Sequence, residues 1–112
     1  MEEFTELTKD RGLYKKILEE GKGPIPNPMA KVILDYKLNM EDGTSIYEQT
    51  NKKIDLSDPN HIQGIKIGVC TMKKGEKSIF VMRYDYAYGE ISYKNIKPFS
   101  TIIACVHLKE IL

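Results

Sequence analysis

The side chains of this sequence that could carry redox or metal chemistry are two cysteines and two histidines. Cys70 and Cys105 are too few and too far apart for a disulfide framework or a zinc finger, so we expect two reduced thiols with structural roles. His61 and His107 have no partners at the spacing of a metal-ligand set. We therefore expect neither a metal site nor a cofactor.

Tyrosine is the more abundant reactive residue type, with seven tyrosines and no tryptophan in the chain. Tyr84, Tyr86 and Tyr88 alternate at the start of a segment that also contains a glycine and a proline, which favours a loop. Their rings could pack this loop with the hydroxyls in water, or they could form a rim that contacts a peptide. Tyr36 also has two possible interpretations. It could be a core residue of a strand, or it could line a pocket.

Several strands are predicted from alternating or β-branched residues. The clearest is the last, in which Ile102, Ala104, Val106 and Leu108 share one face and more polar residues share the other. Another strand runs into Asp42-Gly43, a favoured hairpin turn because both positions tolerate positive φ. The predicted strands are residues 32–38, 45–48, 54–56, 78–83 and 101–109.

One helix is predicted to begin at Asp58-Pro59, where a capping carboxylate precedes a proline at the first helical position. Its apolar face consists of residues spaced three, four and three apart, and Gly75 ends the segment. These residues are Ile62, Ile65, Val69 and Met72. Residues 13–20 also have helical spacing and good helix formers, so their local pattern predicts a second helix.

Five strands with short hairpin connections around one central helix indicate an α+β domain. We expect an antiparallel sheet of five to six strands wrapped around one short α-helix. A length of 112 residues predicts one domain, and 41% hydrophobic with 29% charged residues is ordinary for a soluble protein.

The balance of charged residues argues against partners that would be attracted by a strong electrostatic field of this protein. Net charge is +1, which provides no broad attraction for nucleic acid or anionic membranes. Lys52-Lys53 and Lys73-Lys74 are interpreted as solvated loop charges because no aromatic residues are interleaved with them. No run of 18 apolar residues occurs, and the first residues lack the pattern of a signal peptide. We expect a protein of the cytoplasm or the nucleus.

Short motifs follow one another in an order and spacing that resemble the FKBP family of peptidyl-prolyl cis-trans isomerases. Met72-Lys73-Lys74-Gly75-Glu76-Lys77 is similar to the M-x-x-G-E-K motif of this family, and Ala87-Tyr88-Gly89 matches its A-Y-G. Weaker matches are the Gly21-x-Gly23-x-x-Pro26 loop, the hairpin from Val32 to Gly43, Ile62-Gln63-Gly64 followed by Gly68-Val69, and residues 96–102. The resemblance extends from about residue 13 to residue 112.

This resemblance implies an FKBP-like domain over residues 13–112, preceded by an N-terminal extension over residues 1–12. It also implies that residues 13–20 form a strand, in conflict with their local helical pattern. The family catalyses rotation about X–Pro bonds, which faces a barrier of roughly 18–20 kcal/mol because the amide loses resonance when it is twisted. The family pocket is a dry aromatic one in which the prolyl ring lies on a tryptophan.

Carried over position by position, the resemblance places Tyr36, Ile62 and Tyr88 at pocket positions where the family residue is retained. The other pocket positions have changed residue type. Ile65 stands in place of the tryptophan floor, Ile46 and Tyr47 replace a Phe-Asp pair, Ile54 and Ala104 each replace a phenylalanine, and His61 replaces a valine. We therefore predict a degenerate pocket without catalytic residues, in which Tyr36, Tyr47, Ile62, Ile65 and Tyr88 are the candidates for peptide contact.

Three functions remain compatible with the sequence. The first is a non-catalytic FKBP-like module that binds a protein partner or a proline-containing peptide. The second is a slow but genuine isomerase with an aliphatic pocket, and the third is a nucleic-acid-associated domain that uses its lysine-bearing loops. The changed pocket favours the first function over the second, and the charge balance disfavours the third.

Divergent FKBP domains of this kind resemble those of germline co-chaperones that act in the piRNA pathway and in transposon silencing. Such proteins continue into TPR helices that bind Hsp90. The resemblance therefore implies a link to Hsp90 through a TPR region, which would lie outside these 112 residues because they contain no TPR segment.

Overall fold

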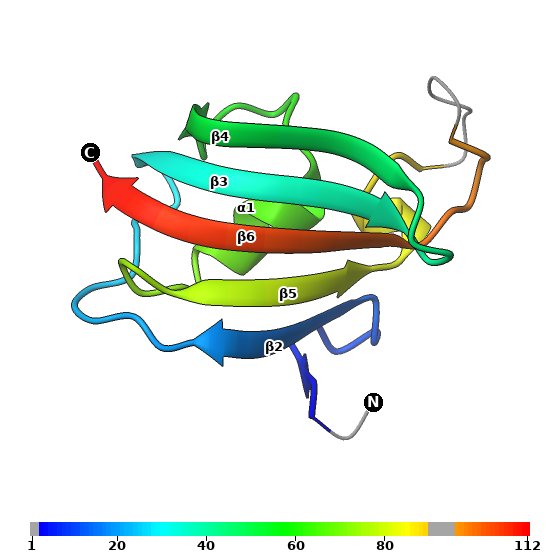
Figure 1. The fold of residues 1–112 in the computed structure, drawn as a ribbon, viewed down its shortest axis with the longest axis horizontal. Coiled ribbons are helices and arrows are strands. Elements are labelled where there is room, and N and C mark those ends of the chain that lie inside the picture. The colour runs from blue at the N-terminus through cyan, green and yellow to red at the C-terminus, as the bar shows by residue number, and fades with distance from the viewer. Residues whose placement is uncertain (1–2, 90–95) are drawn as a thin grey trace.

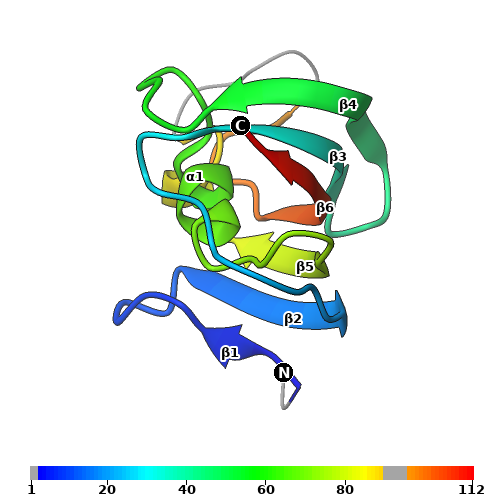
Figure 2. The same ribbon diagram turned by 90° about the vertical axis from the view of Figure 1, so that its left-hand side faces the viewer.

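The computed structural model describes residues 3–89 and 96–112. Within these residues one antiparallel sheet lies against one short α-helix, α1, which packs on a single face of the sheet (Figures 1 and 2). The elements are β1 (Thr5–Glu6), β2 (Leu13–Glu19), β3 (Lys31–Met40), β4 (Ser45–Asp55), α1 (Gln63–Val69), β5 (Lys77–Met82), the 3₁₀ turn η1 (Tyr84–Tyr86) and β6 (Ile102–Ile111).

The six strands have the order β1-β2-β5-β6-β3-β4, and every neighbouring pair is antiparallel. The last strand, β6, therefore lies in the middle of the sheet between β5 and β3 (Figure 1). Its predicted alternation is confirmed, because Ile102, Ala104, Val106 and Leu108 are buried. The expected α+β class, with an antiparallel sheet around one short helix, is confirmed.

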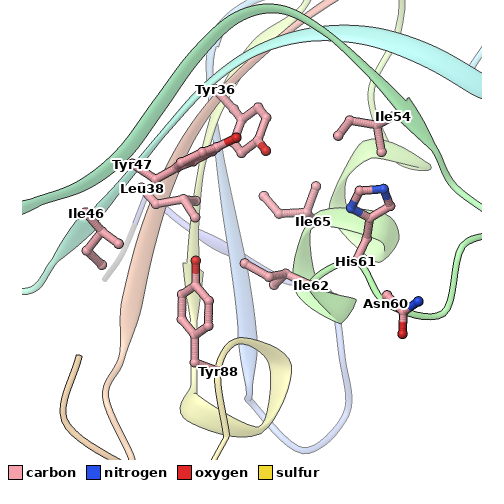
Figure 3. A pocket seen from close by; sticks show the side chains of 10 residues that line it. All are labelled: Tyr36, Leu38, Ile46, Tyr47, Ile54, Asn60, His61, Ile62, Ile65 and Tyr88. Carbon is pink, nitrogen blue, oxygen red and sulfur yellow. The ribbon is translucent and has the colours of Figure 1, made fainter. Parts of the chain in front are cut away.

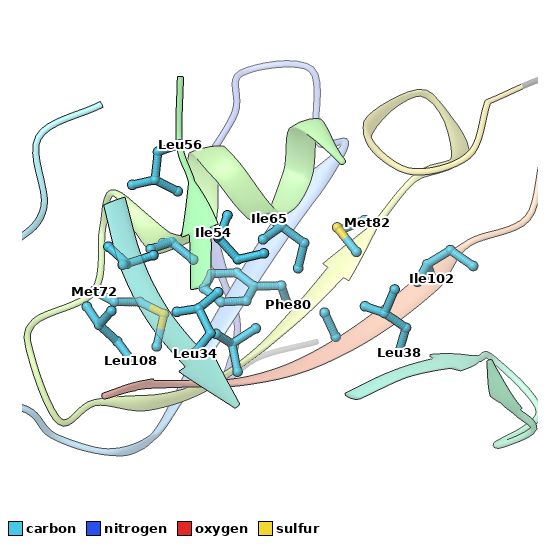
Figure 4. Packing of buried hydrophobic residues seen from close by; sticks show 14 of the residues in the cluster. Leu34, Leu38, Ile54, Leu56, Ile65, Met72, Phe80, Met82, Ile102 and Leu108 are labelled. Atoms are coloured by element: carbon cyan, nitrogen blue, oxygen red, sulfur yellow. The ribbon is translucent and has the colours of Figure 1, made fainter. Parts of the chain in front are cut away.

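The core fills the space between α1 and the face of the sheet that carries the buried strand residues (Figure 4). The largest side chain in this core, Phe80, is fully buried on β5. Leu34 and Leu38 of β3 and Ile65 of α1 belong to the same cluster. The core thus joins the helix to the three central strands, and two of these elements, α1 and β3, also border the hollow described below.

Residues 13–19 form strand β2, so the helix predicted from their local pattern is wrong and the strand implied by the family resemblance is confirmed. The reason is tertiary pairing, because β2 pairs with β5 from Leu13 opposite Met82 onward. Intrinsic helix propensity is a weak prior that such pairing overrides. Within the predicted N-terminal extension, Thr5 and Glu6 form β1 and pair with β2 at the edge of the sheet.

The predicted start of the helix is wrong by several residues, because α1 begins at Gln63 and not at Asp58. Asp58 forms a separate turn, in which its carboxylate accepts a hydrogen bond from the backbone N–H of Asn60 at 2.9 Å. Aspartate stabilises such turns as readily as it caps helices. At the other end, Met72 lies beyond Val69, the last residue of α1, and is nevertheless fully buried in the core.

Strand β4 joins the two short strands predicted at residues 45–48 and 54–56 into one. The central part of β4 is largely exposed at the edge of the sheet, so no buried face imposes an alternating pattern there. The register with β3 shifts near Asn51, whose φ is 53° and whose N–H donates to Asp35 Oδ1 at 2.7 Å. Lys52 and Lys53 are consequently exposed strand residues, and their assignment to a loop is wrong.

A buried ion pair joins β2 to the segment that follows α1, and no pattern in the sequence predicts it. Lys15 Nζ lies 2.8 Å from Glu76 Oε2, and only 8% and 2% of the two side chains are exposed. Lys15 also donates to the backbone oxygen and the hydroxyl of Thr71, each at 3.0 Å. Glu76 accepts hydrogen bonds from the hydroxyl of Ser78 at 2.8 Å and from the N–H of Lys73 at 3.1 Å. Both charges therefore have several partners.

Candidate functional site

A hollow of about 290 Å³ opens between strands β3 and β4 and the start of α1 (Figure 3). Its walls combine aliphatic side chains with three tyrosines, one histidine and one asparagine. The lining residues are Tyr36, Leu38, Ile46, Tyr47, Ile54, Asn60, His61, Ile62, Ile65 and Tyr88. Four different parts of the chain supply these residues, so the hollow exists only in the folded domain.

The structure brings together all of the pocket positions inferred from the family resemblance except Ala104. Leu38 and Asn60 also line the hollow, although the sequence analysis did not single them out. Leu38 could have been found, because it lies two residues after Tyr36 on the same face of a predicted strand. Asn60 belongs to the turn before α1, and no pattern in the sequence marks it.

Ile46 and Tyr47 both line the hollow although they are consecutive residues of one strand. Successive side chains of a regular strand point to opposite faces. Here the register shifts, because Leu38 pairs with Tyr47 while the next residue, Asn39, pairs with Ser45. Ile46 is therefore the extra residue of a β-bulge, and such bulges redirect side chains. This bulge lets β4 contribute two adjacent side chains to the same wall.

The floor of the hollow is aliphatic and is positioned by close packing of α1 on the sheet. Ile65 is 4% exposed and lies at the centre of the lining (Figure 3). The helix approaches β5 closely at two glycines. A Cβ atom on Gly64 would lie 2.3 Å from Met82 Sδ, and one on Gly68 would lie 2.7 Å from the ring of Phe80. Neither position has room for a side chain. Glycine at both positions therefore lets α1 lie close to the sheet, and this close packing sets how deep Ile65 lies in the hollow.

Tyr36 and Tyr88 point into the hollow from opposite sides (Figure 3). The rings of Tyr36 and Tyr47 are 5.5 Å apart and tilted by 53°. Burial raises the pKa of Tyr36 well above its ordinary range, and the contact with Tyr47 raises it further. The Tyr36 hydroxyl is thus protonated well beyond neutral pH, and it lies in the lining of the hollow.

This raised pKa predicts how stability responds to alkaline pH. A tyrosine whose pKa is higher in the folded than in the unfolded state stabilises the fold below the unfolded value of about 10 and loses that contribution as pH rises above it. We expect the free energy of unfolding of the wild type to fall more steeply between pH 9 and 11.5 than that of Tyr36→Phe. Urea unfolding at several pH values measures both slopes, and equal slopes would contradict the prediction.

Ala104 does not line the hollow, and its assignment to the pocket is corrected here. It is fully buried in the core and pairs with Phe80 on the neighbouring strand β5. Directly opposed residues of antiparallel strands share a face and have Cβ atoms about 4.5–5.5 Å apart. The large ring of Phe80 therefore lies beside the small side chain of Ala104.

The tyrosines after β5 have three different environments. The ring of Tyr84 packs edge-on against Phe99 at a centroid distance of 4.9 Å. The hydroxyl of Tyr86 donates to Asp10 Oδ2 at 2.7 Å, so this residue faces the N-terminal segment. Tyr88 alone of the three lines the hollow. Residues 90–95 of the predicted tyrosine-rich loop lie outside the described residues.

The thiols and imidazoles form no joint site in the part of the chain that the structure describes. No group of three or more potential metal ligands occurs among these residues. Cys70 and Cys105 are both free, and burial raises the pKa of the Cys70 thiol. His61 Nε2 lies 3.7 Å from Asp58 Oδ2 at the side of the hollow. His61 thus places a polar ring in a wall that is otherwise mostly apolar.

An antiparallel sheet wrapped on one short helix, with a tyrosine-rimmed hollow between them, defines an immunophilin-type domain. Comparison with known proteins agrees with this class, because residues 23–109 match the family of FKBP-type peptidyl-prolyl cis-trans isomerases. The chain belongs to this family. No helix among the described residues is long and apolar enough to cross a membrane.

Two relatives and one solved structure show what the chain is similar to. It is 25% identical over 103 residues to "Inactive peptidyl-prolyl cis-trans isomerase FKBP6" of Homo sapiens, covering 88% of this chain and 32% of that protein. It is 36% identical over 110 residues to "FK506-binding protein 1" of Gibberella zeae, covering 89% and 98%. A peptidyl-prolyl cis-trans isomerase from Pseudomonas syringae superposes with a TM-score of 0.90 at 24% identity, covering 99% and 82%. The chain thus spans about a third of the length of FKBP6.

Proposed function

We propose that this domain is a protein-interaction module that holds an apolar or proline-containing segment of a partner protein in the hollow, with little or no isomerase activity. The observation that supports this proposal is the aliphatic floor. Ile65 occupies its centre and Ile54, Ile62 and Leu38 surround it, so the floor offers no flat ring to a prolyl side chain. The name of the FKBP6 relatives, which calls them inactive isomerases, is consistent with it.

The physical argument concerns the twisted amide that an isomerase must stabilise. An enzyme accelerates rotation only by binding the twisted amide better than the planar one. This requires that the prolyl group be held firmly while its amide turns. An isoleucine floor in place of tryptophan loses about 80–100 Å² of apolar contact, worth about 2–2.5 kcal/mol, or roughly 30–70-fold in affinity. The hollow can still enclose an apolar side chain without holding it firmly enough for catalysis.

A protease-coupled assay with a proline peptide tests this proposal directly. We expect a rate at least about 30-fold below that of an active FKBP domain at equal concentration. In parallel, titration of a fluorescein-labelled Ala-Leu-Pro-Phe peptide is expected to show binding that Tyr88→Ala weakens. A rate comparable to that of an active FKBP would refute the proposed lack of activity, and a peptide that binds nowhere near Tyr88 would refute the proposed binding site.

A slow but genuine isomerase is the second candidate function. Tyr36, Ile62 and Tyr88 favour it, because these residues surround the hollow and two of them direct hydroxyl-bearing rings into it. The same assay separates the two functions, since a slow isomerase gives a rate that is low but proportional to protein concentration and is abolished by Tyr36→Phe together with Tyr88→Phe. An inactive module gives the uncatalysed rate at every concentration.

The cellular role is proposed from the family resemblance. We place the domain in a co-chaperone of the cytoplasm or nucleus that is linked to Hsp90 through a TPR region outside these residues. The particular relative we favour is the insect germline protein Shutdown, which would connect the domain to piRNA biogenesis and transposon silencing. Tight binding of tacrolimus or rapamycin is not expected. Co-precipitation of Hsp90 with the full-length protein, lost when its TPR region is deleted, would test this role.

A further inference from the structure

The N-terminal segment is tied to the tyrosine-bearing turn after β5 by the carboxylate of Asp10. Its Oδ2 accepts hydrogen bonds from the hydroxyl of Tyr86 at 2.7 Å and from Arg83 Nη2 at 3.0 Å. Its Oδ1 accepts from the hydroxyl of Thr8 at 2.6 Å and from the N–H of Gly12 at 3.0 Å. Both carboxylate oxygens are therefore fully used.

The guanidinium of Arg83 completes this arrangement, which we call the Asp10 clamp and define as Thr8, Asp10, Gly12, Arg83, Asp85 and Tyr86. Arg83 Nε and Nη2 donate to the two carboxylate oxygens of Asp85 at 2.6 and 2.7 Å. Arg83 Nη1 donates to the backbone oxygen of Asp10 at 3.0 Å, and the Arg83 N–H donates to the Gly12 oxygen at 2.8 Å. Hydrogen bonds to ionised groups are stronger than neutral ones.

The clamp is also closely packed, with Tyr86 at its centre. A Cβ atom on Gly12 would lie 2.3 Å from Cε2 of the Tyr86 ring, so only glycine allows the N-terminal segment to lie so close. The electrostatics agree with this geometry. The hydroxyl of Thr8, followed by the hydroxyl of Tyr86, holds the pKa of Asp10 far below its ordinary range, so the carboxylate is ionised at neutral pH.

Tyr86 connects the clamp to two walls of the hollow. On one side its backbone oxygen packs against the first turn of α1, where a Cβ atom on Gly64 would lie 3.0 Å from it, and the floor residue Ile65 follows directly. On the other side Tyr88 follows two residues later, in a turn closed by the N–H of Gly89 on the oxygen of Tyr84 at 2.8 Å. A shift of Tyr86 is therefore expected to displace both walls.

We infer that Asp10 is a positioning residue of the hollow, which sets the placement of Tyr88 and of the first turn of α1 through Tyr86 although it contacts no ligand itself. The N-terminal segment lies outside residues 23–109, which match the family. It nevertheless helps to position the residues that line the hollow. As far as ligand affinity is concerned, this inference rests on the proposed peptide binding. Its structural part can be measured without a ligand.

The test uses the 112-residue chain with Asp10→Ala, Tyr86→Phe and the double variant. We expect Asp10→Ala to shift the amide resonances of Ile65, Tyr88 and Gly89 and to weaken binding of the labelled Ala-Leu-Pro-Phe peptide about tenfold. Tyr86→Phe keeps the ring and removes only the hydroxyl, so we expect smaller shifts in the same direction. The double variant should match Asp10→Ala, because both changes remove the same hydrogen bond.

Asn27→Ala is the matched control, because Asn27 also uses Oδ1 to accept a turn hydrogen bond, from the N–H of Met29 at 2.8 Å, and lies in another loop. It should leave the amides of Ile65, Tyr88 and Gly89 unchanged. The inference is overturned if Asp10→Ala perturbs only amides 8–12 and 83–86, or if the double variant shows the sum of the single effects. If the wild type binds no peptide, the proposed function fails, and the amide shifts still decide whether Asp10 positions the hollow.

Discussion

Glu76→Ala is expected to lower the free energy of unfolding by about 3–5 kcal/mol, because removing one partner of a buried ion pair leaves the other charge uncompensated. Lys15 would lose its only carboxylate partner among the described residues while remaining buried, 8% exposed. The hydroxyl of Ser78 and the N–H of Lys73 would lose their acceptor as well. Urea unfolding followed by circular dichroism measures the change.

The chain offers an exposed ion pair as the matched control for this experiment. Lys74 Nζ lies 3.2 Å from Glu110 Oε2, and about half of each side chain is exposed. Exposed pairs contribute about 0–1 kcal/mol, so Glu110→Ala should change stability by less than 1 kcal/mol. Glu76→Gln, which keeps the shape of the side chain but removes the charge opposite Lys15, should lie between the two. A loss below about 1 kcal/mol for Glu76→Ala would mean that Lys15 escapes to solvent.

Ile65→Trp is expected to tighten binding of the labelled Ala-Leu-Pro-Phe peptide by about 30-fold, since it places a flat aromatic surface where the floor is now aliphatic. The hollow of about 290 Å³ provides space for the larger side chain on its open side. Overpacking beneath the ring would cost about 1–3 kcal/mol of stability. Fluorescence anisotropy measures the affinity. Because the wild-type chain contains no tryptophan, the fluorescence of the introduced indole would report peptide contact directly.

Ile65→Leu is the control for this substitution, because it keeps the volume and the apolar character of the floor without adding a flat face. It should bind the peptide with nearly the affinity of the wild type. A folded Ile65→Trp variant that binds no more tightly than Ile65→Leu would show that the floor does not limit affinity. In that case the residue that limits affinity would have to be sought at the rim, where Tyr47 stands at the position that the family resemblance assigns to an acidic residue.

A strand could be predicted from the sequence where one of its faces is buried, because burial imposes an alternation of apolar and polar residues. The strand at Ile102–Ile111 lies in the middle of the sheet, with one face in the core, and its alternation was clear. The edge strand Ser45–Asp55 has little buried surface, so its centre left no periodic signal. Residues 13–19 have a misleading helical pattern, because their strand is imposed by pairing with residues that lie 58 to 69 positions further along the chain.

Aligned motifs pointed to positions that the structure gathers around one hollow, whereas local chemistry alone settled the role of none of them. Motifs place residues such as Tyr36, Ile62 and Tyr88 because a shared fold brings the same positions together. They misplaced Ala104, because the neighbouring strand carries Phe80 and fills the space that a larger residue at position 104 would need. The Asp10 clamp gave no local signal at all, since Asp10 and Tyr86 are 76 residues apart in sequence.

The pairing of Phe80 with Ala104 restricts how this domain can change by mutation. Both positions are fully enclosed and directly opposed, so a bulky residue at 104 can be accommodated only together with a small one at 80. A small residue at position 80 alone would leave a cavity, and a bulky residue at position 104 alone would cause a steric clash, so each single variant is destabilised. The two positions therefore form an epistatic pair. An aromatic residue at position 104 is therefore expected to be tolerated only when position 80 is made smaller at the same time.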